Sequence, residues 1–305
     1  MGIFTNIGCF EINLFVRERL DFKTLNIVSG APIKRLKTVC GLNPNPEHTK
    51  ADPFLFVHND RLFLFYETDG YKLGHGVISM ISTSDLRQWT KPQVVLHEPF
   101  HLSYPFIFEN DGVVYMMPES GAGGQIRLYR ATNDNLTQFE PAQDLLKGRY
   151  LDSVLLQHGG AYYLFTSDEP EFRQYVLHLF CSDTLWGPYT EHPMSPLCTD
   201  TEYSRSGGRI IEFDGHLYRI AQDCSRDYGE NVTLLSIDRL TPTEYEESIY
   251  CRNVFDRTRE PFRGGGHHLT YVKYKGKYVI ATDCKTTHLG LRNIYTFVRR
   301  FMRNY

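Results

Sequence analysis

Asp52-PFLFVHNDRLFLFY-Glu67 is the stretch that decides the fold, because the chain repeats its pattern four more times. It contains an apolar run, a polar turn, a second apolar run rich in Phe and Tyr, and a closing acid. The other copies are Tyr104-PFIFENDGVVYMMP-Glu119, Asp152-SVLLQHGGAYYLFTS-Asp168, Gly207-GRIIEFDGHLYRIAQ-Asp223 and His267-HLTYVKYKGKYVIAT-Asp283. The closing acids follow one another after 52, 49, 55 and 60 residues, and each copy advances 15 or 16 positions from first to last residue.

Each copy predicts a β-hairpin, because two apolar runs rich in aromatic residues flank a short polar turn. A third run with alternating apolar positions follows each hairpin, most weakly in the last copy, at Asn293-IYTFVRRFM. Hairpins that recur about every 50 residues are typical of the blades of a β-propeller. We therefore predict an all-β fold, a five-bladed β-propeller, with blades beginning near residues 50, 101, 149, 201 and 260.

The first part of the chain, residues 1–48, does not carry the repeat. We predict that it is an N-terminal extension that packs against the propeller, which would occupy residues 49–305. Its apolar run Phe10–Phe15 is a candidate strand that would be added to the last blade. Such an addition would protect a sheet edge that is otherwise exposed.

The composition narrows the range of partners and compartments. The formal net charge is −3 over 305 residues, and no extended block of Lys and Arg occurs, which argues against nucleic acid or an anionic membrane as partner. No apolar run of membrane-spanning length is found, so no transmembrane segment is predicted. Seven scattered cysteines without C-x-x-C spacing favour reduced thiols and a cytoplasmic location over a zinc site or a disulfide framework.

The repeat places a set of polar residues at equivalent positions. In a propeller the first strand of each blade lines the central channel, so the first residues of the five copies should lie around one axis: Asp52, Tyr104, Asp152, Gly207 and His267. Buried carboxylates are costly, and two of them in register favour a functional site over two acids that merely cap turns. A pair of carboxylates usually forms the catalytic centre of enzymes that transfer glycosyl groups, so Asp52 and Asp152 are catalytic candidates.

Further candidates lie beside these positions. Glu119 follows a proline and precedes a glycine-rich loop, so it is the third catalytic candidate, whereas the other closing acids are as well explained as turn residues. Arg205 and Arg209 flank two glycines and are candidates for binding a phosphate or a sugar carboxylate, with surface ion pairs as the alternative. Neighbouring residues on a strand point to opposite sides, so only one of His267 and His268 should face the channel. That histidine would bind a sugar hydroxyl, a phosphate or a metal, or be a hydrogen-bonded core residue.

The chain resembles the N-terminal domain family of glucosamine inositolphosphorylceramide transferase and, more distantly, the five-bladed glycoside hydrolases of families 43, 32 and 130. The phrases that carry this resemblance extend over residues 50–290: Ala51-Asp52-Pro53-Phe54, His101-Leu102-Ser103-Tyr104-Pro105, Met117-Pro118-Glu119, Asp152-Ser153, Gly208-Arg209, Tyr218-Arg219, Gln222-Asp223-Cys224 and Tyr228-Gly229. The transferase activity in the family name is usually attributed to a separate domain.

The resemblance to the hydrolases implies roles for several residues. Asp52 stands where those enzymes keep the base or nucleophile, and Asp152 matches their orienting acid. One of the two histidines matches a position that in some members lies near a central calcium ion; no other cofactor or metal is implied. Gly207-Gly208 occupies the place of their general-acid glutamate, which argues against ordinary hydrolysis.

Together these features predict a glycosyltransferase that moves a sugar from a phosphate-activated donor to a glycan or glycolipid acceptor. A narrower form of this prediction is that the transferred sugar is a furanosyl residue. The setting would be surface polysaccharide or glycolipid biosynthesis. Asp52, Asp152 and Glu119 would be catalytic, and the substrate-binding candidates are Tyr104, Arg205, Arg209, Asp223, His267 and His268. The alternatives are a glycoside hydrolase acting on furanosides and a non-catalytic sugar-binding propeller.

Overall fold

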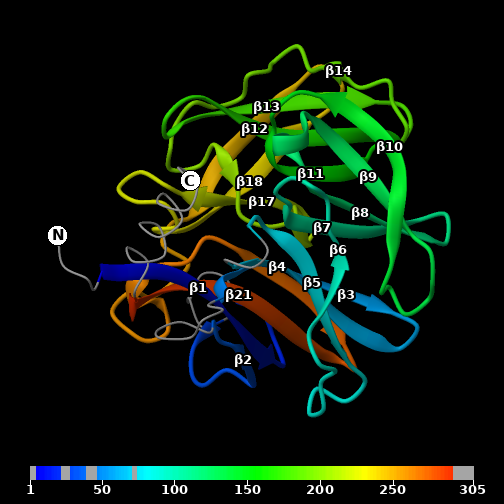
Figure 1. Ribbon diagram of the computed structural model, residues 1–305. Coiled ribbons are helices and arrows are strands. Elements are labelled where there is room, and N and C mark those ends of the chain that lie inside the picture. The colour runs from blue at the N-terminus through cyan, green and yellow to red at the C-terminus, as the bar shows by residue number, and fades with distance from the viewer. Residues whose placement is uncertain (1–4, 22–27, 39–46, 71–73, 291–305) are drawn as a thin grey trace, which may run out of the picture.

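The computed structural model describes residues 5–21, 28–38, 47–70 and 74–290. Within these ranges the secondary structure is β-strand with short 3-10 turns, among them η2 (Gly121–Gly123) and η3 (Phe262–Gly264). The strands form four hydrogen-bonded sheets (Figure 1). The prediction of an all-β fold is thus confirmed.

The first three repeats each form an antiparallel group of four strands. The first group contains β3 (Glu47–His58), β4 (Arg61–Gly70), β5 (Val77–Thr83) and β6 (Gln93–Leu96). The second contains β7 (Ser103–Asn110), β8 (Val113–Glu119), β9 (Gln125–Ala131) and β10 (Phe139–Lys147). The third contains β11 (Leu151–His158), β12 (Ala161–Glu171), β13 (Gln174–Ser182) and β14 (Thr190–Glu191).

The last two groups differ in detail. The fourth contains β15 (Arg205–Ser206), β16 (Ile211–Phe213), β17 (His216–Asp223), β18 (Asn231–Leu240) and β19 (Tyr245–Cys251), with both β15 and β16 pairing with β17. The fifth contains β20 (Leu269–Tyr274), β21 (Lys277–Gly290), β1 (Thr5–Arg17) and β2 (Lys34–Leu36). A parallel bridge from Phe10 to Thr49 joins the fifth group to the first in one eight-stranded sheet.

The polar turn of every copy has the same geometry, which explains why the repeat is visible in the sequence. Each is a two-residue turn with both residues in the left-handed region, as hairpins of two-residue loops require. The φ values are 46° and 56° in the first copy and 49° and 77° in the last. The five turns are Asn59-Asp60, Asp111-Gly112, Gly159-Gly160, Asp214-Gly215 and Lys275-Gly276.

The N-terminal strand completes the last group. β1 runs antiparallel to β21 along its whole length, from Thr5 opposite Gly290 to Arg17 opposite Tyr278. Figure 1 shows these two strands from opposite ends of the chain side by side. The place beside β21 is therefore taken by β1, and the strand predicted at residues 293–302 lies outside the described residues. The division at residue 48 remains a prediction.

The first strands of successive groups are neighbours. β3 contacts β7, β7 contacts β11, and β11 contacts β15. After β15, the amide of Leu269 on β20 donates to the carbonyl of Gly207, at 2.8 Å. β20 in turn contacts β3. The first residues of the five copies are thereby brought to a common centre.

Apolar side chains fill the space between neighbouring groups and fix their order. Phe65 of the first group meets Phe139 of the second, and Phe165 of the third meets Tyr245 of the fourth, with ring centroids 6.1 and 5.7 Å apart. The largest core cluster extends from the first group to the fourth, and smaller clusters join the fourth to the fifth and the fifth to the first. Cys181, Cys198, Cys224 and Cys284 are free thiols. None of the helical turns in those ranges has the length and apolar character needed to cross a bilayer.

Candidate active site

A repeated irregularity of the backbone turns the first residues of three copies toward the centre. Asp52, Tyr104 and Asp152 have φ values of 50°, 45° and 46°, which is uncommon for residues other than glycine. Each lies in a break of the strand pairing, between Ala51 and Phe54 in the first copy and at the matching places in the next two. Such bulges redirect a side chain, and strained backbone of this kind clusters at functional sites.

Asp52 lies in a buried cluster with His267 and Asp283. Its Oδ1 is 3.5 Å from Nε2 of His267, whose Nδ1 lies 2.8 Å from Oδ2 of Asp283. Asp283 also accepts from the backbone amide of His267, at 2.8 Å. The imidazole is thus held between two carboxylates from different groups, with Phe10 and Tyr228 packed against its ring.

The protonation of this cluster is set by burial and by the neighbouring charges. Burial raises the pKa of Asp52 to about 7, with His267 acting against this shift and Asp152 adding to it. Burial opposes protonation of His267, but the charge and hydrogen bond of Asp283 outweigh it and raise the pKa of the ring. The pKa of Asp283 is lowered, because His267 more than offsets the cost of its burial. Asp52 therefore has the pKa of a base that works near neutral pH.

His268 also faces Asp52, so the expectation that only one of the two histidines faces the centre is wrong. Its Nδ1 is 3.7 Å from Oδ1 of Asp52. The two histidines precede β20 and are not in strand conformation, so the alternation of a strand does not apply to them. Burial lowers the pKa of His268 to about 3, and the neutral ring packs against Phe54 and Tyr104.

Asp152 is held by a cation and an amide from the fourth group. Nε and Nη2 of Arg205 lie 2.7 and 2.5 Å from its Oδ2, and the side-chain amide of Gln222 donates to the same oxygen at 2.7 Å. The guanidinium group of Arg205 also lies over the rings of Tyr175 and Tyr228. The guanidinium group of Arg205 therefore binds the Asp152 carboxylate and fixes its orientation.

Glu119 and Glu67 complete the acidic cluster. Glu119 accepts weakly from the backbone amide of Asp152, at 3.4 Å, and lies 3.9 Å from Nη2 of Arg205. Glu67 occupies the equivalent place in the first group, because it pairs with Ala51 as Glu119 pairs with Ser103. Burial, reinforced by neighbouring acids, raises the pKa of both glutamates well above the usual range.

Three predicted substrate-binding residues have other partners. The Tyr104 hydroxyl donates to the carbonyl of Gly208 at 2.8 Å and accepts from its amide at 2.9 Å, so it links the second group to the fourth. Arg209 donates to the carbonyls of Leu55 and Ile107, at 3.4 and 3.1 Å. Asp223 accepts from the amide and hydroxyl of Ser225, as in a local turn. Each of these three residues thus has a partner within the protein, and their roles in substrate binding stay predictions.

Gly207 and Gly208, which the resemblance to hydrolases puts at the position of a general-acid glutamate, have a packing reason. A Cβ on Gly207 would lie 2.7 Å from the carbonyl oxygen of His267, and one on Gly208 would lie 2.1 Å from that of Leu269. Gly208 also has a φ of 152°. The fourth and fifth groups approach each other so closely here that no side chain fits.

Three residues of the cluster were not predicted as site residues: Asp283, Gln222 and Glu67. The register of each hairpin explains why, since a shift of one residue turns a side chain to the other face. In the third copy the residue before the closing acid pairs like Glu67, because Ser167 is opposite Leu151, whereas in the fourth copy Gln222 is opposite Arg205, two residues before Gly207. The spacing is 15 positions in the first two copies and 16 in these two, but it is also 16 in the fifth copy, where Asp283 contacts His267, so the spacing alone does not separate inward from outward acids.

The donor set does not fit the central calcium ion that the hydrolase resemblance allows. Asp52, His267 and Asp283 each offer a ligand atom, all within 4.8 Å of one another. Calcium prefers six to eight oxygen ligands, whereas this set contains two carboxylates and an imidazole. Asp283 is already engaged by the ring and the amide of His267. We therefore assign no metal chemistry to this cluster.

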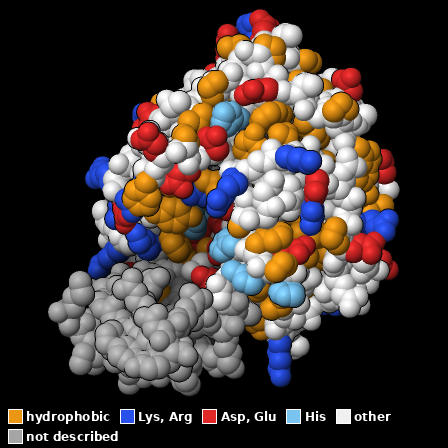
Figure 2. Space-filling view, turned by 45° about the horizontal axis from the view of Figure 1, so that its top comes forward, with side chains coloured by type: hydrophobic (Ala, Val, Ile, Leu, Met, Phe, Trp, Pro, Cys, Tyr) orange, Lys and Arg blue, Asp and Glu red, His pale blue; other side chains and the backbone are white. Residues whose placement is uncertain are grey.

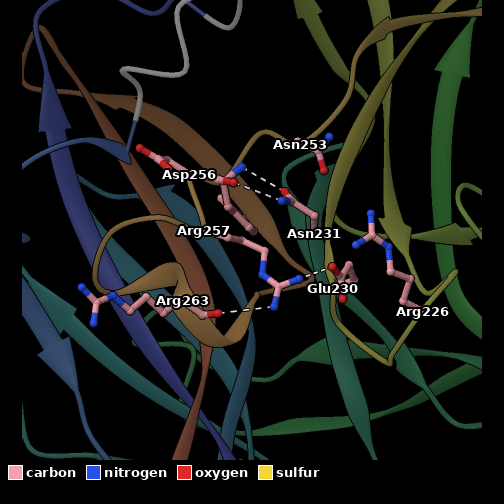
Figure 3. A pocket seen from close by; sticks show the side chains of 8 residues that line it. Arg226, Glu230, Asn231, Asn253, Asp256, Arg257 and Arg263 are labelled. Atoms are coloured by element: carbon pink, nitrogen blue, oxygen red, sulfur yellow. Dashed lines mark hydrogen bonds and ion pairs between the residues drawn. The ribbon is translucent and has the colours of Figure 1, made fainter.

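An open pocket of about 500 Å³ is lined by residues of two chain segments, 226–231 and 253–263. One wall contains Glu230, which closely follows Tyr228 in the chain, and the other contains Arg263, which precedes the glycines before His267. Figure 3 shows the ion pair between Arg257 and Glu230, and the bond from Arg257 to the carbonyl of Arg263, inside this pocket. The space-filling view in Figure 2 shows a hollow bordered by acidic, basic and histidine side chains.

Residues 32–283 match the family described as glucosamine inositolphosphorylceramide transferase 1, N-terminal. The chain belongs to this family. The protein of that name from Oryza sativa subsp. japonica is 38% identical over 208 residues, which cover 66% of this chain and 28% of the rice protein. The Arabidopsis thaliana protein is 36% identical over 259 residues, which cover 79% and 34% of the two chains. The chain thus spans about a third of the length of the curated relatives it matches.

Solved structures with a similar fold are glycoside hydrolases. A family 117 glycoside hydrolase from the marine bacterium Zobellia galactanivorans has a TM-score of 0.53 and 14% identity, over 84% of this chain and 89% of that one. GH43B of the Bacteroides ovatus xyloglucan PUL has a TM-score of 0.52 and 15% identity, over 71% and 44%. At these identities the likeness concerns the fold.

Proposed function

We propose that this family member is a five-bladed propeller that catalyses glycosyl transfer at the centre of its five strand groups. The observation that carries the proposal is the meeting of Asp52 and Asp152 in one buried cluster while each has a different partner. Asp52 faces a histidine, and Asp152 is ion-paired with Arg205. Two carboxyl groups whose environments differ in this way are typical of acid–base pairs in glycosyl chemistry.

In the proposed reaction Asp52 acts as the base. Its Oδ1 is buried and has no hydrogen-bond partner within the described residues, and the nearest nitrogens of His267 and His268 lie 3.5 and 3.7 Å away. Asp52 takes the proton of the acceptor hydroxyl as that oxygen attacks the anomeric carbon of the donor. His267 and Asp283 hold the carboxyl in place and tune its pKa. General base catalysis by a placed carboxylate contributes about 10²- to 10⁴-fold in rate.

Asp152 and Glu119 have the supporting roles. Asp152, fixed by Arg205 and Gln222, orients the sugar and stabilises the positive charge that develops at the anomeric carbon. Glu119 lies against the same arginine and is the second acid–base group of the site.

The proposed donor is a phosphate-activated sugar, and a narrower form of the proposal is that this sugar is a furanose. The proposed acceptor is a glycolipid. The relatives' name contains inositolphosphorylceramide, a phosphorylated lipid. Arg205 is engaged with Asp152 and Arg209 with backbone carbonyls, so other cations are the better candidates for binding phosphate. Arg226 and Arg263 line the open pocket, where Arg263 is exposed and its Nε lies 3.7 Å from Oε1 of Glu260, and we propose that a phosphate of the donor or acceptor binds there.

The proposed setting is the synthesis of surface polysaccharides or glycolipids, in the cytoplasm. The free cysteines of the described ranges support a reducing compartment. The proposal is tested by incubating the purified protein with activated sugars and lipid or glycan acceptors and detecting the glycosylated product. Release of free sugar without transfer would support the hydrolase alternative. Binding without turnover would support a sugar-binding module.

A further inference from the structure

Glu67 is placed beside Asp52 by the pairing of the first hairpin. It lies opposite Ala51, the residue that precedes Asp52, and it is 8% exposed. The proposed reaction uses Glu119 at the equivalent place in the second group but gives no role to Glu67. The chain therefore has a second buried glutamate at the centre, on the side of the proposed base.

His101 holds this glutamate from the start of the second group. Its Nδ1 accepts a hydrogen bond from the backbone amide of Gly76 at 3.0 Å. In the neutral ring the proton must then be on Nε2, which lies 3.5 Å from Oε1 of Glu67. Burial lowers the pKa of His101, which favours this neutral form. The His101 side chain is 39% exposed, so the pair extends from the buried acids to solvent.

Gly76 leaves the space that this pair occupies. A Cβ at this position would lie 2.6 Å from Cε1 of His101, 2.9 Å from Oε1 of Glu67 and 2.5 Å from the carbonyl oxygen of Leu102. A side chain here would displace the imidazole or the carboxyl. The local sequence is therefore shaped to fit the two groups together.

The charges around Glu67 favour its protonated form. Burial has the largest effect on its pKa, and the next four effects come from acids, which all act in the same direction: Asp52, Asp69, Glu119 and Asp152. Glu119 differs from Glu67, because the positive charge of the nearby Arg205 acts to lower the pKa of Glu119 and partly offsets the effects of burial and of the neighbouring acids. Glu67 is thus a buried carboxyl group whose surroundings favour the protonated form, and a neutral acid can donate that proton.

We propose that Glu67 is the proton donor to the leaving group, with His101 as its positioning residue, an inference that rests on the proposed glycosyl transfer. As the bond between the anomeric carbon and the leaving oxygen breaks, its electron pair stays on that oxygen, which takes the proton of Glu67. Asp52 accepts the proton of the acceptor hydroxyl. A phosphate leaving group needs little protonation in water. In this site several carboxyl groups surround it, so a proton from Glu67 lowers the negative charge of the phosphate and reduces its repulsion by these acids.

The experiment compares two kinds of donor in four proteins. Sugar phosphates and the matching glycosyl fluorides are assayed across pH with the wild type, Glu67→Gln, Glu119→Gln and Asp52→Asn. The kcat of Glu67→Gln with sugar phosphates should fall about 100-fold. With glycosyl fluorides, whose leaving group needs less protonation, the variant should keep most of the wild-type rate. Its pH profile with sugar phosphates should lose the decline at high pH. Asp52→Asn should lose activity with both donors.

A second readout does not depend on turnover. The infrared carbonyl absorption of protonated carboxyl groups at neutral pH, to which Glu119 and Asp52 also contribute, should lose one component in Glu67→Gln and stay unchanged in Glu109→Gln, a matched change at the far end of the second hairpin. His101→Phe should shift the pH at which this component is lost.

The outcomes separate the two proposals. If Asp52→Asn is inactive but Glu67→Gln keeps full activity with sugar phosphates, the assignment of Glu67 is wrong and glycosyl transfer stands. If fluorides rescue Glu119→Gln instead, Glu119 is the donor. If Asp52→Asn is as active as the wild type, or no donor is turned over, the proposed function itself fails.

Discussion

Nε of Arg205 lies 2.7 Å from Oδ2 of Asp152, and this contact joins the fourth strand group to the third at the centre of the molecule. Both side chains are almost fully buried. The pair therefore contributes to the fold and also orients the second carboxylate of the proposed active site.

Replacing Arg205 with Met should destabilise the protein by about 3–5 kcal/mol, because it leaves Asp152 buried without its cation. The free energy of unfolding from urea denaturation measures this effect. Arg130→Met is the control, since Arg130 pairs with Glu140 at the surface, where solvent screens the pair, and its loss should change the free energy of unfolding much less. Equal losses in the two variants would show that the Asp152 pair is not the buried contact described here.

Tyr104→Phe should lower the free energy of unfolding by about 1–3 kcal/mol, because the amide and carbonyl of Gly208 both lose their partner. The variant should bind sugar as well as the wild type. Urea denaturation combined with calorimetric titration of the sugar donor tests both statements. A weaker affinity at unchanged stability would support Tyr104 as a substrate-binding residue.

The stability of the protein should depend on pH through Asp52. Its pKa is raised to about 7 in the folded state from about 4 in the unfolded chain. Between these values the folded state binds more protons, so stability falls as pH rises, by a few kcal/mol over this range. Asp52→Asn should therefore be more stable than the wild type at pH 8 and about equally stable near pH 4. Thermal melts across this pH range measure the difference, and a gap that does not widen with pH contradicts the assignment.

Gly76→Ala should disturb the site without changing any acid. Its methyl group would collide with His101 and Glu67, so the high-pH side of the activity profile should shift. Overpacking of this kind costs about 1–3 kcal/mol of stability. Gly112→Ala is the control, because its φ of 74° imposes backbone strain but no atom lies near the added methyl. The pH profile of Gly112→Ala should match that of the wild type.

The fold could be predicted from the sequence because the repeat is local. Each hairpin is encoded by its own apolar runs and by a turn such as Asp111-Gly112, which readily takes left-handed backbone. The partners across the centre could not be predicted in the same way. Arg205 meets Asp152 across 53 residues, and Asp52 meets Asp283 across 231. Such pairs depend on how neighbouring groups pack, which no local pattern records.

The acids at the hairpin ends show where sequence reasoning failed. Asp223 and Asp283 both follow the first residue of their copy by 16 positions, yet only Asp283 faces the centre. The difference arises because β17 pairs in register with β15, whereas the residues before β20 leave the strand and bring His267 and His268 to the same side. The spacing alone does not contain this change of backbone.

Transfer of sugar by Asp52→Asn protein is the measurement that tests the central claim most directly. Wild type and variant are incubated with the same sugar phosphate and glycolipid acceptor, after circular dichroism has shown that both are folded. The account predicts that the wild type forms the glycosylated product and that the variant is slower by about 100-fold or more. Equal rates in the two proteins would contradict the role of Asp52 and, with it, the proposed active site.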